Sequence, residues 1–98
     1  MYSADDLLHL LHSDGADELR LHVGDPPIVI LDGEENPVEG PPLSAENVGE
    51  LFRSLTTTRQ RREFRERGGV QFIYRFRDSV DFVVRATLDG PDIGIVIH

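Results

Sequence analysis

The sequence predicts an α+β fold, in which about three helices pack on one face of a largely antiparallel sheet of five to six strands. Two segments within the first 55 residues repeat apolar side chains at the helical spacing i, i+3, i+4 and i+7. Residues 70–97 instead alternate apolar and polar side chains in three segments divided by turn residues, which predicts an antiparallel meander. The chain has 98 residues and no internal repeat, so we expect a single domain over residues 1–98.

The first helix is predicted over residues 3–13. The apolar side chains on one face of it are Ala4, Leu7, Leu8 and Leu11. Ser3 is the expected N-cap, and Asp6 three residues later gives a capping-box pattern with aspartate in place of glutamate. Gly15 follows the helix, where glycine readily adopts the left-handed conformation that ends many helices.

Two strands are predicted after this helix. Residues 18–23 alternate polar and apolar side chains, as in a half-buried strand. Gly24-Asp25-Pro26-Pro27 then interrupts the strand, because proline lacks an N–H and restricts the residue before it. Residues 28–31 are an apolar, β-branched run that predicts the second strand, with Asp32-Gly33 as its turn. Residues 35–38 are a candidate for a short third strand.

Two further helices are predicted in the middle of the chain. Ser44 is the N-cap of the first of them, whose apolar face consists of Val48, Leu51, Phe52 and Leu55. Thr57 and Gln60 form a capping box for the next helix, at about residues 59–67. Phe64 is the only large apolar residue of that helix. We therefore expect a surface helix held by one aromatic side chain and ended by the two glycines that follow it.

Three strands are predicted in the last third of the chain, each with one apolar face. The side chains expected on the buried face are Val70, Phe72, Tyr74, Phe76, Val80, Phe82, Val84, Ala86, Leu88, Ile93, Ile95 and Ile97. Asp78-Ser79 and Asp89-Gly90-Pro91 are the predicted turns between these strands.

Several features of the first half occur in an order seen in a known family. They are Ala16-Asp17 at a strand start, Gly24-Asp25-Pro26-Pro27, Asp32-Gly33, and Pro41-Pro42-Leu43-Ser44 before a helix. This order resembles the type IV pilus retraction ATPase family (PilT) and its type II secretion relatives. The resemblance covers roughly the whole chain, but only the N-terminal, PAS-like domain of those ATPases, without the motor domain. It implies a PAS-like fold and a domain that packs on a neighbouring subunit's ATPase domain in a hexameric ring.

The machinery for nucleotide chemistry is missing from the sequence. There is no Gly-x-x-x-x-Gly-Lys-Ser/Thr loop, and a chain without lysine cannot supply its ammonium group. The family's nucleotide-facing Arg-Phe-Arg-Val-Asn pattern falls on Asp81-Phe82-Val83-Val84-Arg85, so both of its arginine positions are non-basic here. The family's arginine before the Asp-Gly turn falls on Ile30, and its strand histidine falls on Arg20. We expect no enzyme, no catalytic residue and no cofactor.

The histidines are the best candidates for a metal site. His9 and His12 are spaced i, i+3 on the first helix and could face the same way. A zinc site needs three or four protein ligands, so His22 and an acidic residue would have to converge on them. Because His9 and His12 lie largely outside the leucine face, we expect exposed side chains and no metal.

The charge distribution predicts one candidate site. The net charge is −8 and all ten basic residues are arginines, of which five lie between residues 59 and 67. These five, Arg59, Arg61, Arg62, Arg65 and Arg67, are a candidate protein-interaction patch for an acidic partner or for a second copy of this chain. The alternative is a solvated helix face with internal pairs such as Arg62 with Glu66. Nucleic acid is not an expected partner, because the net charge is negative and no exposed aromatic platform adjoins the arginines.

The expected function is therefore a non-catalytic protein-interaction or regulatory module of a type IV pilus (twitching motility) or secretion system. Its expected partner is a pilus or secretion motor subunit, or the chain itself. We expect a cytoplasmic protein without membrane insertion, because there is no cysteine, no apolar run of the roughly 18 residues a membrane span needs, and an acidic N-terminus. Two alternatives remain: a PAS-like sensor with a ligand pocket beside Phe72, Tyr74 and Phe82, or a diverged fragment without independent function.

Overall fold

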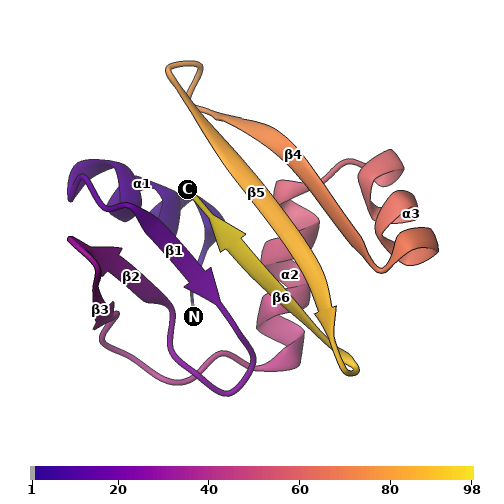
Figure 1. Ribbon diagram of the computed structural model, residues 1–98, viewed down its shortest axis with the longest axis horizontal. Coiled ribbons are helices and arrows are strands. Elements are labelled where there is room, and N and C mark those ends of the chain that lie inside the picture. The colour runs from indigo at the N-terminus through magenta and orange to yellow at the C-terminus, as the bar shows by residue number, and fades with distance from the viewer. Residues whose placement is uncertain (1) are drawn as a thin grey trace.

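The computed structural model describes residues 2–98, which form three helices and six strands (Figure 1). In chain order the elements are α1 (Ala4–Ser13), β1 (Glu18–Leu21), β2 (Ile28–Leu31), β3 (Glu34–Pro37), α2 (Ala45–Leu55), α3 (Thr58–Arg67), β4 (Gly69–Phe76), β5 (Val80–Asp89) and β6 (Asp92–Ile97). The predicted α+β class is confirmed, including the short third strand.

All six strands belong to one sheet with the order β3-β2-β1-β6-β5-β4. Every neighbouring pair is antiparallel, and the predicted meander of β4, β5 and β6 is confirmed. The first strand of the chain lies beside the last one, with Leu19 opposite Ile97 and Leu21 opposite Ile95. This pairing leaves β3 and β4 as the two edges of the sheet.

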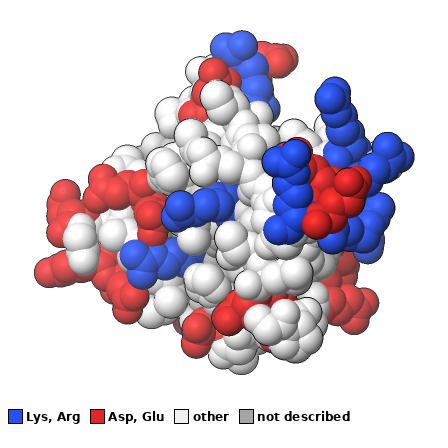
Figure 2. Space-filling model, turned by 45° about the vertical axis from the view of Figure 1, so that its right-hand side comes forward, with Lys and Arg blue, Asp and Glu red and all other residues white. Residues whose placement is uncertain are grey.

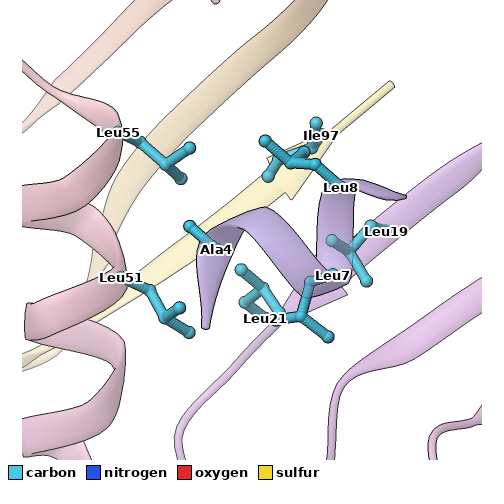
Figure 3. A pocket seen from close by; sticks show the side chains of 8 residues that line it. All are labelled: Ala4, Leu7, Leu8, Leu19, Leu21, Leu51, Leu55 and Ile97. Atoms are coloured by element: carbon cyan, nitrogen blue, oxygen red, sulfur yellow. The ribbon is translucent and has the colours of Figure 1, made fainter. Parts of the chain in front are cut away.

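The helices lie on one face of the sheet. Figure 1 shows α1 and α2 behind the strands, while α3 lies beside β4 at the edge of the molecule. The core forms between the first two helices and the inward face of the strands, where Leu8, Val84 and Ile95 are completely buried. Figure 3 shows side chains of α1, α2, β1 and β6 converging in this layer, and the space they enclose has no room for a water molecule. The interior is a packed core rather than a ligand cavity.

The predicted helix caps are confirmed. The Ser3 hydroxyl accepts a hydrogen bond from the Asp6 N–H at 3.2 Å, and the Ser44 hydroxyl accepts one from the Asn47 N–H at 3.0 Å. Thr57 and Gln60 form the reciprocal capping box of α3, each side chain accepting the other's backbone N–H. These bonds satisfy donors that the first turn of a helix cannot pair internally.

The structure differs from the sequence prediction in two details of the meander. The turn between β4 and β5 begins at Arg77, because Arg77 and Asp78 both adopt the left-handed conformation, with φ of 50° and 54°. Leu88 was expected on the buried face but is 49% exposed. Its ladder partner in β6 is Ile93, but its neighbour on the β4 side is Gly68, which accepts a hydrogen bond from the Leu88 N–H and has no side chain to cover it.

Candidate protein-interaction surface

Exposed arginines project from α3. Phe64 is the one buried residue of this helix, at 5% exposure, and its ring packs on that of Phe52 with centroids 4.8 Å apart. Since one aromatic side chain anchors the helix, most of its circumference faces solvent. Four of the five predicted patch residues lie on that exposed circumference: Arg59, Arg62, Arg65 and Arg67.

The fifth predicted residue, Arg61, is half-buried and hydrogen-bonded within the chain. Its Nη1 donates to the carbonyl oxygen of Thr56 at 2.7 Å, to the hydroxyl of Thr56 at 3.0 Å and to the carbonyl oxygen of Arg53 at 3.3 Å. Its Nη2 donates to the Thr58 hydroxyl at 3.3 Å. Carbonyls at the end of a helix have no internal partner, and a cation is favourable there. Arg61 therefore joins the end of α2 to the start of α3.

A hollow of about 220 Å³ lies between α2 and α3. The apolar side chains that line it are Phe52, Phe64 and Ile93, and the charged ones are Arg53, Arg61 and Arg65. Guanidinium groups beside an apolar wall suit a carboxylate carried on an aliphatic side chain, because the charge and the alkyl part are both accommodated. Arg53 was missed by the sequence analysis because it lies on the preceding helix. Its only sequence signal is its place in the last turn of α2.

We call the exposed residues Arg53, Arg59, Arg62, Arg65 and Arg67 the arginine surface. Figure 2 shows blue side chains gathered on the side of the molecule that carries α3. The expected pair between Arg62 and Glu66 is not formed; Glu63 pairs with Arg67 instead, at 4.0 Å. Within residues 2–98, Arg59, Arg62 and Arg65 form no ion pair. Their charges are therefore free to meet an acidic partner.

The charge of the whole chain is strongly divided. Residues 51–77 contain eight of the ten arginines but only two of the eighteen acidic residues. The other residues are correspondingly acidic, and Figure 2 shows red side chains on the left and along the bottom of the molecule, with a further red group among the blue side chains on the right. The molecule thus has one basic end on an otherwise acidic body.

A second feature is a groove of about 300 Å³ along β4, which we call the β4 groove. Its residues are Ser54, Leu55, Thr56, Thr57, Gln60, Phe72, Ile73, Tyr74 and Arg75. Phe82, which the sensor hypothesis placed at a pocket with Phe72 and Tyr74, lies in the core against Phe76 instead. The β4 groove is open to the surface, so it is not the enclosed ligand cavity that the sensor hypothesis requires.

His9 and His12 are exposed on α1, and the Nδ1 of His9 lies 3.4 Å from Arg77. No cluster of three or more potential metal ligands occurs among residues 2–98.

Within the same residues, none of the three helices is long and apolar enough to cross a membrane.

Comparison with solved structures connects this geometry to a group of ATPases. The crystal structure of the pilus retraction motor PilT with bound ADP superposes with a TM-score of 0.90 and 21% identity. The ATPase DotB of Legionella pneumophila superposes with a TM-score of 0.81 and 20% identity. The chain has a PilT-like domain fold. No protein-family model and no curated protein matches the sequence.

The PilT-like fold accounts for the chain from end to end but for only part of the ATPases. The PilT match covers 100% of this chain and 29% of that protein, and the DotB match covers 99% and 29%. The resemblance named from the Pro-Pro and Asp-Gly motifs is thus confirmed as a likeness of fold. The chain spans less than a third of the length of either ATPase.

The uncovered face of the PilT-like sheet carries the positions at which the family's basic residues were expected. Asp81 is exposed and pairs with Arg75 at 3.4 Å, while Val83 is half-buried. Arg20, on β1, pairs with Glu18 at 2.5 Å, and this hydrogen bond raises the pKa of Arg20. Ile30, opposite Glu18 in the ladder, is only 8% exposed. On this face Arg20 and Arg75 are paired with carboxylates, whereas Arg59, Arg62 and Arg65 of the arginine surface form no ion pair within residues 2–98.

Proposed function

We propose that this chain is a non-catalytic interaction module related to the N-terminal domains of pilus retraction and secretion ATPases. It binds a motor subunit through the arginine surface. The observation that carries this proposal is the exposed guanidinium groups of Arg59, Arg62 and Arg65, which form no ion pair within residues 2–98 of a PilT-like domain. The absence of a phosphate-binding loop and of lysine from the sequence supports a role without catalysis. Because the proposed partner is such a motor, the proposed location is the cytoplasm.

The electrostatics of this surface favour rapid, specific encounter over tight binding. Each exposed ion pair contributes about 0–1 kcal/mol, so affinity must come from several pairs formed together. A single-sign surface also steers an oppositely charged partner and suppresses encounters in the wrong orientation. Since the Debye length is about 8 Å at physiological salt, binding should weaken as salt is added.

A second candidate is self-association. The arginine surface of one copy would meet the acidic body of the next, which the division of charge along the chain favours. Such a contact joins two different surfaces, and contacts of that type generate rings or open chains. The binding experiment described next distinguishes a motor subunit from a second copy of this chain as the partner.

The test measures binding of the purified domain to the purified motor ATPase of the same organism by biolayer interferometry. Arg65→Glu should weaken binding about tenfold or more, the equivalent of ~1.4 kcal/mol. Arg85→Glu is the matched control, because Arg85 is exposed on the uncovered sheet face, away from the arginine surface. It should leave the affinity within about twofold of wild type, as expected for a charge outside the contact.

Equal losses in the two variants would indicate a general charge effect and would refute the proposed surface. If the wild-type domain does not bind the motor but forms oligomers that Arg65→Glu disperses, the partner is a second copy. Circular dichroism of both variants checks that the fold is retained.

A further inference from the structure

The two edges of the sheet differ in how well they are protected. β3 has four residues, two of them the exposed glutamates Glu34 and Glu35, and ends at Pro37. Short length, charge and proline are the usual means by which an edge strand avoids pairing with other chains. β4 has eight residues, contains no proline and is the other edge. α3 lies beside β4, but the β4 groove leaves open space along residues 72–75, so this part of the β4 edge is suited to accept another strand.

The register identifies which backbone groups of β4 are free. Val83 exchanges two hydrogen bonds with His98, at 2.7 and 3.0 Å, so its backbone N–H and C=O point toward the β6 side. Consecutive residues of an antiparallel strand point these groups to opposite sides. Phe82 and Val84 therefore bond to β4, at their partners Tyr74 and Phe72.

By the same alternation, Gln71, Ile73 and Arg75 direct their N–H and C=O groups away from the sheet. No hydrogen bond from another residue in the range 2–98 reaches these groups. The side chain of Ile73 is 68% exposed, the most exposed large apolar side chain in this part of the chain. The free edge thus presents three donors and three acceptors around an exposed isoleucine.

The surroundings of this edge fit an extended strand. The β4 groove runs along residues 72–75, with Phe72 and Tyr74 half-buried in it and Gln60 of α3 on its other wall. A strand added beside β4 would direct alternate side chains into this groove and toward Ile73. Apolar or β-branched residues of the added strand would therefore find apolar neighbours on both faces of the sheet, in the groove on one face and at Ile73 on the other.

We propose that the β4 edge binds an extended, acidic peptide segment of a protein partner as an additional strand of the sheet. This inference rests on the proposed function and names the binding mode and the partner's chemistry. The acidic character follows from charge: Arg75, which also pairs with Asp81 at 3.4 Å, is the charged residue that lines the groove, and residues 51–77, from which all the lining residues come, hold eight of the ten arginines and only two acidic residues. Main-chain hydrogen bonds supply affinity and the alternate side chains supply specificity, as in other cases of strand addition.

The test uses a short fluorescein-labelled peptide of alternating valine and threonine with glutamates at both ends. Fluorescence anisotropy measures its binding to the domain, and hydrogen exchange by NMR follows single amides. The amides of Gln71, Ile73 and Arg75 should exchange rapidly in the free domain and at least about tenfold more slowly with peptide. Those of Phe72 and Tyr74 should be slow in both states, because they already bond to β5.

Two controls isolate the backbone contribution. A peptide of the same sequence with methylated amide nitrogens on the bonding side should bind at least about tenfold more weakly, because it lacks the donors. Ile73→Pro removes a donor that faces away from the ladder, a position at which edge strands tolerate proline, and should abolish binding. Ile73→Thr keeps both the donor and a β-branched side chain, and should bind like wild type. NMR spectra of both variants verify their folds.

Three results would overturn the proposal. The first is equal binding of the methylated peptide, and the second is unchanged exchange at residues 71, 73 and 75. The third is protection of these amides without peptide that rises with protein concentration, which would make a second copy the occupant. The two proposals can fail separately. If Arg65→Glu loses motor binding but the peptide leaves amide exchange in β4 unchanged, this inference is refuted and the proposed function stands.

Discussion

At the scale of single residues, Arg61 and Arg62 have different roles although they are adjacent and identical. Arg62 is exposed and unpaired within residues 2–98, whereas Arg61 bonds to the carbonyls of Arg53 and Thr56. The sequence pattern gave all five arginines of residues 59–67 the same prediction. It could not separate them, because Arg61 acquires its partners only when the chain turns between α2 and α3. Arg53 was missed for the same reason.

Arg61→Ala should destabilise the domain by about 1–3 kcal/mol. The substitution removes charge-assisted hydrogen bonds and leaves the half-buried Thr56 carbonyl oxygen without this donor. For a domain of this size, each kcal/mol corresponds to about 4–8 °C in Tm. Thermal unfolding followed by circular dichroism measures the change.

Arg62→Ala is the control for this prediction, because it deletes the same side chain from a solvent-exposed position. It should alter stability by no more than about 0.5 kcal/mol. Equal effects of the two substitutions would show that Arg61 does not brace the α2–α3 corner.

At the scale of the secondary-structure elements, α3 depends on a single contact. Phe64 is the one buried side chain of the helix and packs on Phe52. Phe64→Ala should cost about 3–5 kcal/mol by leaving a cavity, and should release the helix that carries most of the arginine surface. Hydrogen exchange should therefore rise in α3 more than in α1, and motor binding should weaken.

Phe64→Leu tests whether this contact depends on apolar volume. It should retain most of the exchange protection in α3, because leucine still fills much of the site. If Phe64→Ala left α3 as protected as wild type, the helix would be held by its capping box and by Arg61 rather than by the aromatic pair.

The elements themselves were predictable because their signals are local. Caps such as Ser44 and Thr57 lie within a few residues of the groups they satisfy, and the apolar spacing of Val48 to Leu55 reports directly on one helix face. The exposure of Leu88 was not predictable from alternation. It depends on Gly68, a residue twenty positions earlier that lies beside it only in the folded sheet.

At the scale of the whole molecule, residues 2–98 enclose their own core. Helix side chains of α1 and α2 and the inward side chains of β1, β5 and β6 form one cluster, and the radius of gyration of 12.7 Å is that of a compact domain of this length. The pairing of β1 with β6, which closes this cluster, joins residues almost eighty positions apart. No local pattern specifies that pairing, and the sequence analysis did not predict it.

We expect the 98-residue chain to unfold in a single cooperative transition without any further segment. Urea unfolding followed by far-ultraviolet circular dichroism and by tyrosine fluorescence should give the same midpoint, as in two-state domains. Different midpoints would mean that part of the structure is stable only with additional chain or a partner.

The unequal edges of the sheet also limit how copies of this domain could aggregate. If β4 of one molecule paired with β4 of another, the two free edges would be consumed together, and the ends of the joined sheet would be two copies of β3. The glutamates and the proline of β3 disfavour any further addition there. Growth would therefore stop at a pair, so misassembly through this sheet should produce soluble dimers and not fibrils.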